Sequence, residues 1–215
     1  MNDLTTQLTT TIAAFVLSSS SGLRAYLPIF ALGLAGALGI PSQQTAHMAL
    51  GQSYGILTNP IVLVVLGILS VLEIVADKIP GVDHVSDAIH TAIRPVMGAL
   101  IFAGTNNVVS HQSPLLAGAL GLVLAGGVHA TKALAVRPVT TATTAGIGNP
   151  VVSIIEDIIS VASVVLAIFV PVVALILFII FIVLFVLLFR RILRRRREKW
   201  LQKELARRGQ SVQSG

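Results

Sequence analysis

The chain has 215 residues, of which 54% are hydrophobic and only 11% are charged, and its mean hydropathy is +0.89. Soluble domains carry roughly 25% charged residues, so this chain cannot hide its apolar side chains in one water-soluble core. Cysteine is absent, which excludes disulfides and thiolate metal sites. The composition predicts an all-α, polytopic transmembrane helical bundle.

The positive charge is concentrated near the C-terminal end of the sequence. Ten of the fifteen Lys and Arg residues lie between Arg190 and Arg208, and with two glutamates this stretch sums to +8. The other five basic and seven acidic residues sum to −2. The basic character therefore belongs to a tail, and it does not predict a nucleic-acid-binding protein.

Six apolar segments follow one another along the chain. We place them at about 11–39, 61–79, 85–104, 114–134, 150–170 and 171–189. Ser18 to Gly22 and Pro28 interrupt the first segment, which predicts a broken or re-entrant helix, and Pro171 is expected to separate the last two. One kinked helix over 150–189 is the alternative, and it gives five spans. The third segment either crosses the membrane or re-enters it.

Basic residues near the span ends predict the orientation in the membrane. We expect the basic tail on the cytoplasmic side, and six spans then place the N-terminus there too. The same side receives the basic residues between the spans: Lys78, Arg94, Lys132 and Arg137. Five spans would put these four residues outside, so the positive-inside rule favours six spans.

Short matches relate the two halves of the chain. Gly22–Ala25 (GLRA) is similar to Gly127–Ala130 (GVHA), and Asn59-Pro60 recurs later as Asn149-Pro150. With three spans per half, the second half enters the membrane from the opposite side, which predicts the inverted 3+3 repeat of many transporters. The expected parts are 1–104, 105–189 and the tail 190–215. Chance similarity between small-residue helices is the alternative.

Polar side chains at membrane depth are the candidate functional groups, because each is costly there without a partner or water. Arg24 lies in the middle of the first segment, where it suits either an anionic ligand or an ion pair with an acidic residue. His129 lies at the repeat-related position, where it suits either a proton relay or a hydrogen-bonded place in the core.

Acidic residues form a second group of candidates near the cytoplasmic ends of two segments. Glu73 and Asp77 are one helical turn apart, and Glu156 and Asp157 lie about two turns into the fifth segment. The predicted substrate or ion pathway contains Arg24, His129, Glu73, Asp77, Glu156 and Asp157. No metal or other cofactor is predicted.

A cytoplasmic polar face is expected around the start of the third segment. Its members are Lys78, Asp83, Asp87, His90 and Arg94. The last four share one side of a helix, so they suit either a cation or proton path or an interfacial helix with internal Asp–His–Arg pairing.

The tail begins with a cluster of arginines directly after the last apolar segment. The cluster consists of Arg190, Arg191, Arg194, Arg195, Arg196 and Arg197. Such juxtamembrane clusters attract anionic lipid headgroups, so membrane lipids are the expected partner and nucleic acid is not. Small-residue runs such as Gly33–Gly39 permit close helix approach and are compatible with a homo-oligomer.

The segments Ser21–Pro28 (SGLRAYLP) and Glu73–Pro80 (EIVADKIP), with Asp83 and Asp87, resemble a family of bacterial integral membrane proteins with plant relatives. The family is described only as domain of unknown function 4126. The resemblance covers roughly residues 17–171 and supplies no activity. It implies a multi-pass protein of the bacterial cytoplasmic membrane, and the charge distribution puts both termini in the cytoplasm.

Motifs of soluble enzymes are absent from the sequence, including G-x-S-x-G, the Walker A loop and H-E-x-x-H, so no enzyme activity is predicted. The leading hypothesis is a small transporter or channel that moves an ion or small anionic solute between two inverted repeats. One alternative is a lipid translocase in which headgroups pair with Arg24. Another is a non-transporting scaffold that binds anionic lipid or a partner through its tail.

Overall fold

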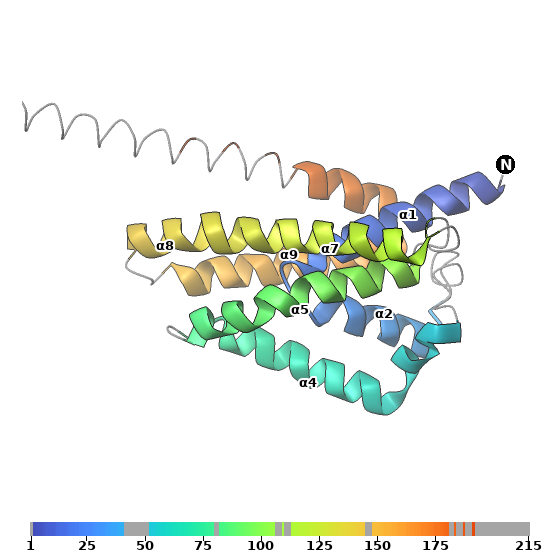
Figure 1. Cartoon of the computed structure of the whole chain (residues 1–215), viewed down its shortest axis with the longest axis horizontal. Coiled ribbons are helices and arrows are strands. Elements are labelled where there is room, and N and C mark those ends of the chain that lie inside the picture. The colour runs from blue at the N-terminus through green and yellow to red at the C-terminus, as the bar shows by residue number, and fades with distance from the viewer. Residues whose placement is uncertain are drawn as a thin grey trace, which may run out of the picture. The chain divides into compact units, whose positions relative to one another are not determined.

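The computed structural model describes residues 2–40, 52–79, 82–105, 109, 113–144, 148–180, 183, 187 and 191 of the chain. Every regular element in these residues is a helix, as the sequence predicted (Figure 1). In chain order they are α1 (Asn2–Ser21), α2 (Leu27–Ala37), the 3₁₀ helix η1 (Gln52–Thr58), α4 (Pro60–Ala76), α5 (Val82–Thr105), α7 (Pro114–Thr131), the π-helix η2 (Lys132–Val136), α8 (Arg137–Thr144) and α9 (Asn149–Phe169). A further helix, Pro171–Ile180, follows α9.

The first apolar segment folds into a helical hairpin whose first arm is α1. This arm packs beside α7 and runs in the same direction, because the Ser18 hydroxyl donates to Gly121 O at 3.1 Å and Gly22, four residues later, lies against Ala125. Both contacts advance by four residues in the same sense on the two helices, so α1 and α7 are parallel.

The second arm, α2, leaves the hairpin turn in the opposite direction. It packs antiparallel to α4, because the Phe30 ring lies against Gly67 and Tyr26, four residues earlier, donates its N–H to Glu73 at 3.3 Å. α4 and α7 run in the same direction (Figure 1), so α1 and α2 are antiparallel. Both open ends of the hairpin lie at the end of the bundle where α4 and α7 begin.

This hairpin differs from the path that the predicted six-span topology gives to the first segment. That topology made residues 11–39 cross the membrane, with the N-terminus on one side and the linker 40–59 on the other. In the structure the chain returns to the end from which α1 starts, as in the predicted broken segment. The count of six spans is not confirmed, and the cytoplasmic location of the termini stays a prediction.

The local sequence explains the hairpin turn that starts at Gly22. The Ser21 hydroxyl donates to Ser18 O at 2.7 Å in the last turn of α1, so serines take up carbonyl groups that the ending helix leaves free. Pro28 lies in the first turn of α2, where a missing N–H costs nothing. A Cβ at Gly22 would overlap Ala125 O, so only glycine lets the turn lie this close to α7.

Three helices of the described residues are long and apolar enough to cross a bilayer: Val85–Thr105, Pro114–Ala142 and Asn149–Phe169. The third predicted segment thus matches a full-length helix, α5, that tolerates Pro95 in its interior. α9 ends at Phe169, Val170 has the non-helical φ of −142°, and the next helix begins at Pro171. The predicted break near Pro171 is confirmed.

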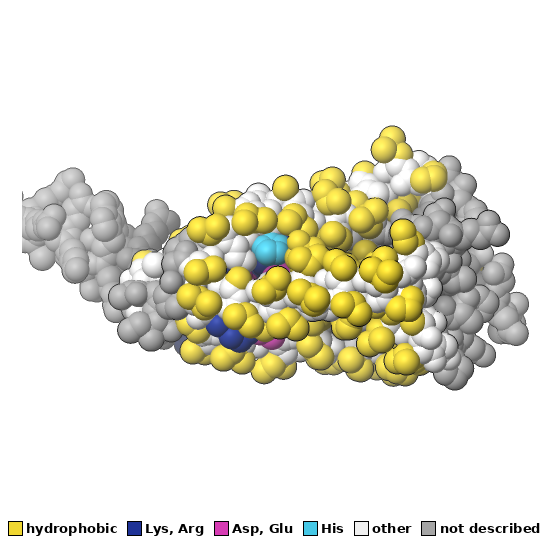
Figure 2. All heavy atoms as spheres, turned by 90° about the horizontal axis from the view of Figure 1, so that it is seen from below, with side chains coloured by type: hydrophobic (Ala, Val, Ile, Leu, Met, Phe, Trp, Pro, Cys, Tyr) yellow, Lys and Arg dark blue, Asp and Glu magenta, His cyan; other side chains and the backbone are white. Residues whose placement is uncertain are grey.

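The outer surface of the bundle is apolar. Ile61, Leu115, Val123 and Ile158 are among many large apolar side chains that are more than half exposed. Figure 2 shows one face on which apolar side chains cover most of the described surface, with only a few charged or His side chains between them. A surface of this kind is stable only in lipid, so the protein is a membrane protein with transmembrane helices.

The inverted repeat is not confirmed by the helix directions. It matches Gly22–Ala25, at the end of α1, with Gly127–Ala130 on α7, and an inverted repeat requires these to run in opposite directions. α1 and α7 run in the same direction, whereas α4 and α9, the other matched pair, run in opposite directions (Figure 1). The chain divides instead into the units Met1–Phe178 and Ile179–Gly215, and the expected parts 1–104, 105–189 and 190–215 stay a prediction.

Close packing of α5 against α7 predicts a sharp difference between two glycines of α7. A Cβ at Gly121 would overlap Gly98 O and lie 2.7 Å from Phe102 Cβ, whereas a Cβ at Gly118 would meet nothing within 4 Å. We expect Gly121→Ala to destabilise the bundle by ~1–3 kcal/mol through overpacking, and Gly118→Ala to be neutral or slightly stabilising. The melting temperatures of both variants in detergent check this. Equal melting temperatures would contradict the packing described.

Candidate functional site

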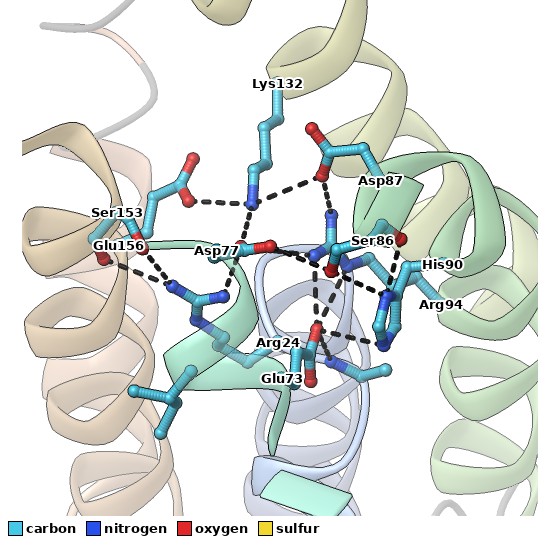
Figure 3. A network of polar contacts seen from close by, with 12 residues as sticks. Arg24, Glu73, Asp77, Ser86, Asp87, His90, Arg94, Lys132, Ser153 and Glu156 are labelled. Carbon is cyan, nitrogen blue, oxygen red and sulfur yellow. Dashed lines mark hydrogen bonds and ion pairs between the residues drawn. The ribbon is translucent and has the colours of Figure 1, made fainter. Parts of the chain in front are cut away.

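A single ionic network fills the interior of the bundle near the end where α4 ends and α9 begins (Figure 3). It contains all the basic residues that precede the tail: Arg24, Lys78, Arg94, Lys132 and Arg137. It also contains five carboxylates: Glu73, Asp77, Asp87, Glu156 and Asp157. The formal charges cancel (5 − 5 = 0), which is the condition under which charged groups are tolerated in a bundle interior.

Arg24 lies at the tip of the hairpin and is fully buried. Each of its nitrogens has a partner: Nη1 bonds to Asp77, Nε lies 2.5 Å from Asp157 Oδ1, and Nη2 donates to the Ser153 hydroxyl at 2.8 Å. The hairpin thus carries a cation into the bundle centre, where α4 and α9 supply the compensating carboxylates. The ion pair expected as one alternative for Arg24 is present.

Asp77 is the centre of the network. One of its oxygens, Oδ2, is surrounded by four cationic groups: Arg24 Nη1, Lys132 Nζ at 3.0 Å, Arg137 Nη2 at 3.3 Å and Arg94 Nη2 at 3.7 Å. The other oxygen, Oδ1, accepts the Ser86 hydroxyl at 3.0 Å. Asp77 is the C-cap residue of α4, so the end of that helix delivers one carboxylate to the meeting point of four elements.

Glu73 holds the hairpin tip in place. Its carboxylate accepts the backbone N–H of Ala25 at 3.0 Å and of Tyr26 at 3.3 Å, and it also accepts Arg94 Nη2 at 3.1 Å. Tyr26 is the N-cap residue of α2 and its own side chain makes no capping hydrogen bond. Glu73 therefore supplies the cap from a neighbouring helix, where a negative charge also suits the positive end of the α2 dipole.

The two histidines make hydrogen bonds that identify their tautomers. Arg94 Nη1 donates to His129 Nδ1 at 2.8 Å, and since a guanidinium cannot accept, the His129 proton is on Nε2, which faces Thr91 Oγ1 at 3.1 Å. His90 Nδ1 lies 2.7 Å from the Ser86 carbonyl and donates to it. His129 thus occupies the hydrogen-bonded core position expected as one alternative, next to Arg94 of the predicted cytoplasmic polar face.

The edge of the network reaches the surface of the bundle. Lys78 Nζ lies 2.5 Å from Asp157 Oδ2, and the side chain of Lys78 is 33% exposed. On the inner side of the same region, Lys132 Nζ lies 2.8 Å from Glu156 Oε2. The predicted acids of α4 and α9 are therefore brought together with Arg24.

Some of the predicted residues lie outside the described part of the chain. Asp83 belongs to the first turn of α5, but its side chain is not among those described. In the tail, Arg191 is helical and exposed, whereas the others lie outside the described residues: Arg190, Arg194, Arg195, Arg196 and Arg197. Binding of anionic lipid by the tail and self-association both stay predictions.

A pocket of about 340 Å³ adjoins the network between α5 and α8. It is lined by Asp87, Ala133, Arg137, Pro138, Thr141 and Ala142. Arg137 Nε lies 2.6 Å from Asp87 Oδ2, and Arg137 Nη2 lies 3.3 Å from Asp77 Oδ2, so Arg137 contacts both a pocket residue and Asp77. Among the described residues, no group of three His, Asp or Glu side chains is arranged to hold a metal ion.

Sequence reasoning missed Lys132, Arg137, Ser86 and Ser153 as members of the site. The positive-inside rule placed Lys132 and Arg137 in a water-facing linker, whereas η2 and α8 continue α7 and bury both side chains. One signal was present in the sequence, because the five basic residues before the tail are similar in number to the seven acids there. Such a balance indicates mutual pairing.

Comparison with known families identifies the chain. It belongs to the family described as domain of unknown function (DUF4126), which matches residues 11–191. The resemblance predicted from Ser21–Pro28 and Glu73–Pro80 is confirmed. No curated protein and no solved structure matches the chain.

Charge balance in the network predicts that neutralising a carboxylate recovers the stability lost when its cationic partner is neutralised. Lys132→Met leaves four cations against five carboxylates, and loss of one partner of a buried pair costs ~3–5 kcal/mol. We expect Lys132→Met to lower the melting temperature in detergent strongly, and Lys132→Met with Glu156→Gln to recover most of the loss.

Lys78→Met is the matched control, because the same side chain is removed at the exposed edge of the network. Its effect should be small, as exposed pairs contribute ~0–1 kcal/mol. A double variant that is less stable than Lys132→Met alone would contradict the charge-balance account.

Proposed function

We propose that this member of the DUF4126 family moves a small anion across the membrane through the ionic network at the hairpin tip. The observation that carries the proposal is the convergence of four cationic groups on Asp77 Oδ2 inside a bundle with an apolar surface. Cationic groups at membrane depth mark ion and substrate pathways, and a cluster of them around one point favours negative charge there.

The pocket between α5 and α8 supports an entrance to this pathway. It borders the Arg137–Asp87 ion pair, and Arg137 Nη2 lies 3.3 Å from Asp77 Oδ2 on the other side of that pair. One guanidinium thus contacts both the pocket wall and the central carboxylate. We assign the Arg137–Asp87 pair as the gate between them.

A line of small hydroxyl side chains supports an exit on the other side of Arg24. Ser153 accepts from Arg24, and Ser160, two turns further along α9, lies 2.9 Å from the Ser20 hydroxyl of α1. Ser163 is also buried on α9. These hydroxyls continue the polar interior toward the end of the bundle where α1 starts, and they can hydrogen-bond an anion without adding charge.

Helix interruptions at the network are a further point in favour of transport. The hairpin turn breaks the first segment at Arg24, and the π-helix η2 places Lys132 in an irregular turn between α7 and α8. Binding sites of secondary transporters are typically built where helices are discontinuous near the membrane centre, and π-helical turns are frequent at functional sites.

Lipid translocation is the second candidate, and Lys78 favours it. Its side chain is 33% exposed and pairs with Asp157 next to the exposed apolar residues Ile79 and Ile158. An anionic headgroup could meet this cation while its acyl chains remain in the bilayer. Movement of a whole lipid would then follow the outer edge of the network and depend on Lys78.

Reconstitution of the purified protein into liposomes separates these functions. Liposomes made permeable to potassium with valinomycin and placed in potassium chloride, nitrate or formate report anion movement by swelling. We expect swelling faster than in protein-free liposomes for the wild type. Arg24→Gln should fall to the protein-free rate because it removes a cation of the central site.

Lys78→Met is the matched control for a cation at the edge. It should keep anion movement if the pathway is internal. A parallel assay with a fluorescent lipid and an impermeant quencher measures lipid movement, which Lys78→Met should reduce only if lipids are the cargo. Folded wild-type protein without activity in either assay would contradict transport and favour the scaffold hypothesis.

A further inference from the structure

The Asp77 carboxylate interacts unfavourably with the helix that carries it. Asp77 is the C-cap residue of α4, and a negative charge at a helix C-terminus is repelled by the helix dipole. What stabilises the carboxylate is therefore the set of cations contributed by other segments. Lys132 Nζ at 3.0 Å and Arg137 Nη2 at 3.3 Å come from η2 and α8, and Arg24 comes from the hairpin tip.

The two carboxylates of α9 each contact fewer cations than Asp77 does. Glu156 pairs with Lys132, and Asp157 pairs with Arg24 and the partly exposed Lys78. Without Asp77, five cations would face four carboxylates, so the site would carry one unmatched positive charge. A single monovalent anion restores neutrality, whereas a divalent anion overshoots it.

We propose that the Asp77 carboxylate is a built-in substitute for the transported anion, and that small carboxylates of the size of formate and acetate are the ligands that take its place. The side chain beyond the Asp77 Cα is a carboxymethyl group, which has the shape and charge of acetate. Its two oxygens have separate donors, because three guanidinium groups face Oδ2 and the Ser86 hydroxyl donates to Oδ1, an arrangement that suits a carboxylate better than a spherical ion.

The transport part of this inference rests on the proposed function, and the binding part is independent of it. Displacement follows from the chemistry: an incoming carboxylate forms the contacts that Asp77 Oδ2 now makes, and Asp77 is free to leave because its backbone lies at the end of α4. The occupied site then stays neutral, because the ligand supplies the negative charge that Asp77 has withdrawn. A site of this kind exchanges an external anion against an internal one.

Substitution of Asp77 tests the inference directly. Asp77→Ala removes the carboxylate and keeps the Cβ as a methyl group, so it leaves room for formate. The melting temperature in detergent should fall, and formate should restore it saturably. The wild type should show no such shift. Asp77→Asn is the matched control, because it removes the charge but fills the space, and formate should not restore its melting temperature.

Other salts, and the same substitution at Asp157, test the specificity of the site for formate. At equal ionic strength, gluconate is too large and chloride is not planar, so both should restore Asp77→Ala less than formate does. Asp157→Ala should not respond saturably to formate, since Lys78 at that site is partly exposed to the surroundings. Equal restoration by all these salts, or the same response of Asp157→Ala, would overturn the inference.

If Asp77→Ala does not fold in chloride, the inference can still be tested with this variant. The yield of monodisperse protein after solubilisation in formate is then compared with the yield in gluconate, and recovery in formate alone supports the inference, whereas no recovery in either overturns it. If formate restores Asp77→Ala but the wild type moves no anion in liposomes, the proposed transport is wrong and the binding site is retained. If the wild type moves anions but formate does not restore Asp77→Ala, the substitute role of Asp77 is wrong and the proposed transport is retained.

Discussion

Mutual neutralisation of charged side chains inside an apolar bundle is the constraint on which this structure depends. Each buried cation would be costly alone, because neither lipid nor the surrounding apolar side chains can solvate it. The network meets this cost with equal numbers of positive and negative groups, and Asp77 connects four of the five cations through one oxygen. Loss of any inner member leaves an unmatched charge, so the helices that carry these residues are held at fixed depths relative to one another.

Charge balance also makes the centre of the network sensitive to a charged ligand, since a net change of one unit is enough to redistribute the contacts between its side chains.

The hairpin of α1 and α2 is what brings the network to the centre. Gly22 lets the turn approach α7, and Glu73 caps the first N–H groups of α2, so that Arg24 is presented between them. Gly98 and Gly121 bring α5 and α7 into direct backbone contact, and the Ser18 hydroxyl of α1 lies within hydrogen-bonding distance of both carbonyl oxygens. Small residues and short hydroxyl side chains thus allow the helices to pack closely around the polar interior.

Much of this arrangement was predictable from the sequence, and the remainder depended on three-dimensional contacts. Composition gave the helical membrane class, and Arg24 between serines and prolines indicated a broken helix with a cation at depth. The direction of α2 was not predictable, because a span and a re-entrant hairpin have the same local signals until the contacts with α4 and α7 are known. Lys132 and Arg137 were assigned to a linker by their position near a span end, and only the continuation of α7 into η2 and α8 shows that they point into the bundle. The inverted repeat is not confirmed for a related reason, since short matches between small-residue helices carry no information about helix direction.

Water access to the interior distinguishes an ion pathway through the network from a dry structural ion cluster. The chain has no cysteine, so single thiols can be introduced without background. Ser160→Cys lies on the proposed exit, Val161→Cys points to lipid from the next position of α9, and Thr144→Cys is an exposed control at the end of α8. With a membrane-impermeant anionic thiol reagent, we expect modification of Ser160→Cys and Thr144→Cys and none of Val161→Cys. Complete protection of Ser160→Cys in folded protein, with Thr144→Cys fully modified, would contradict the pathway.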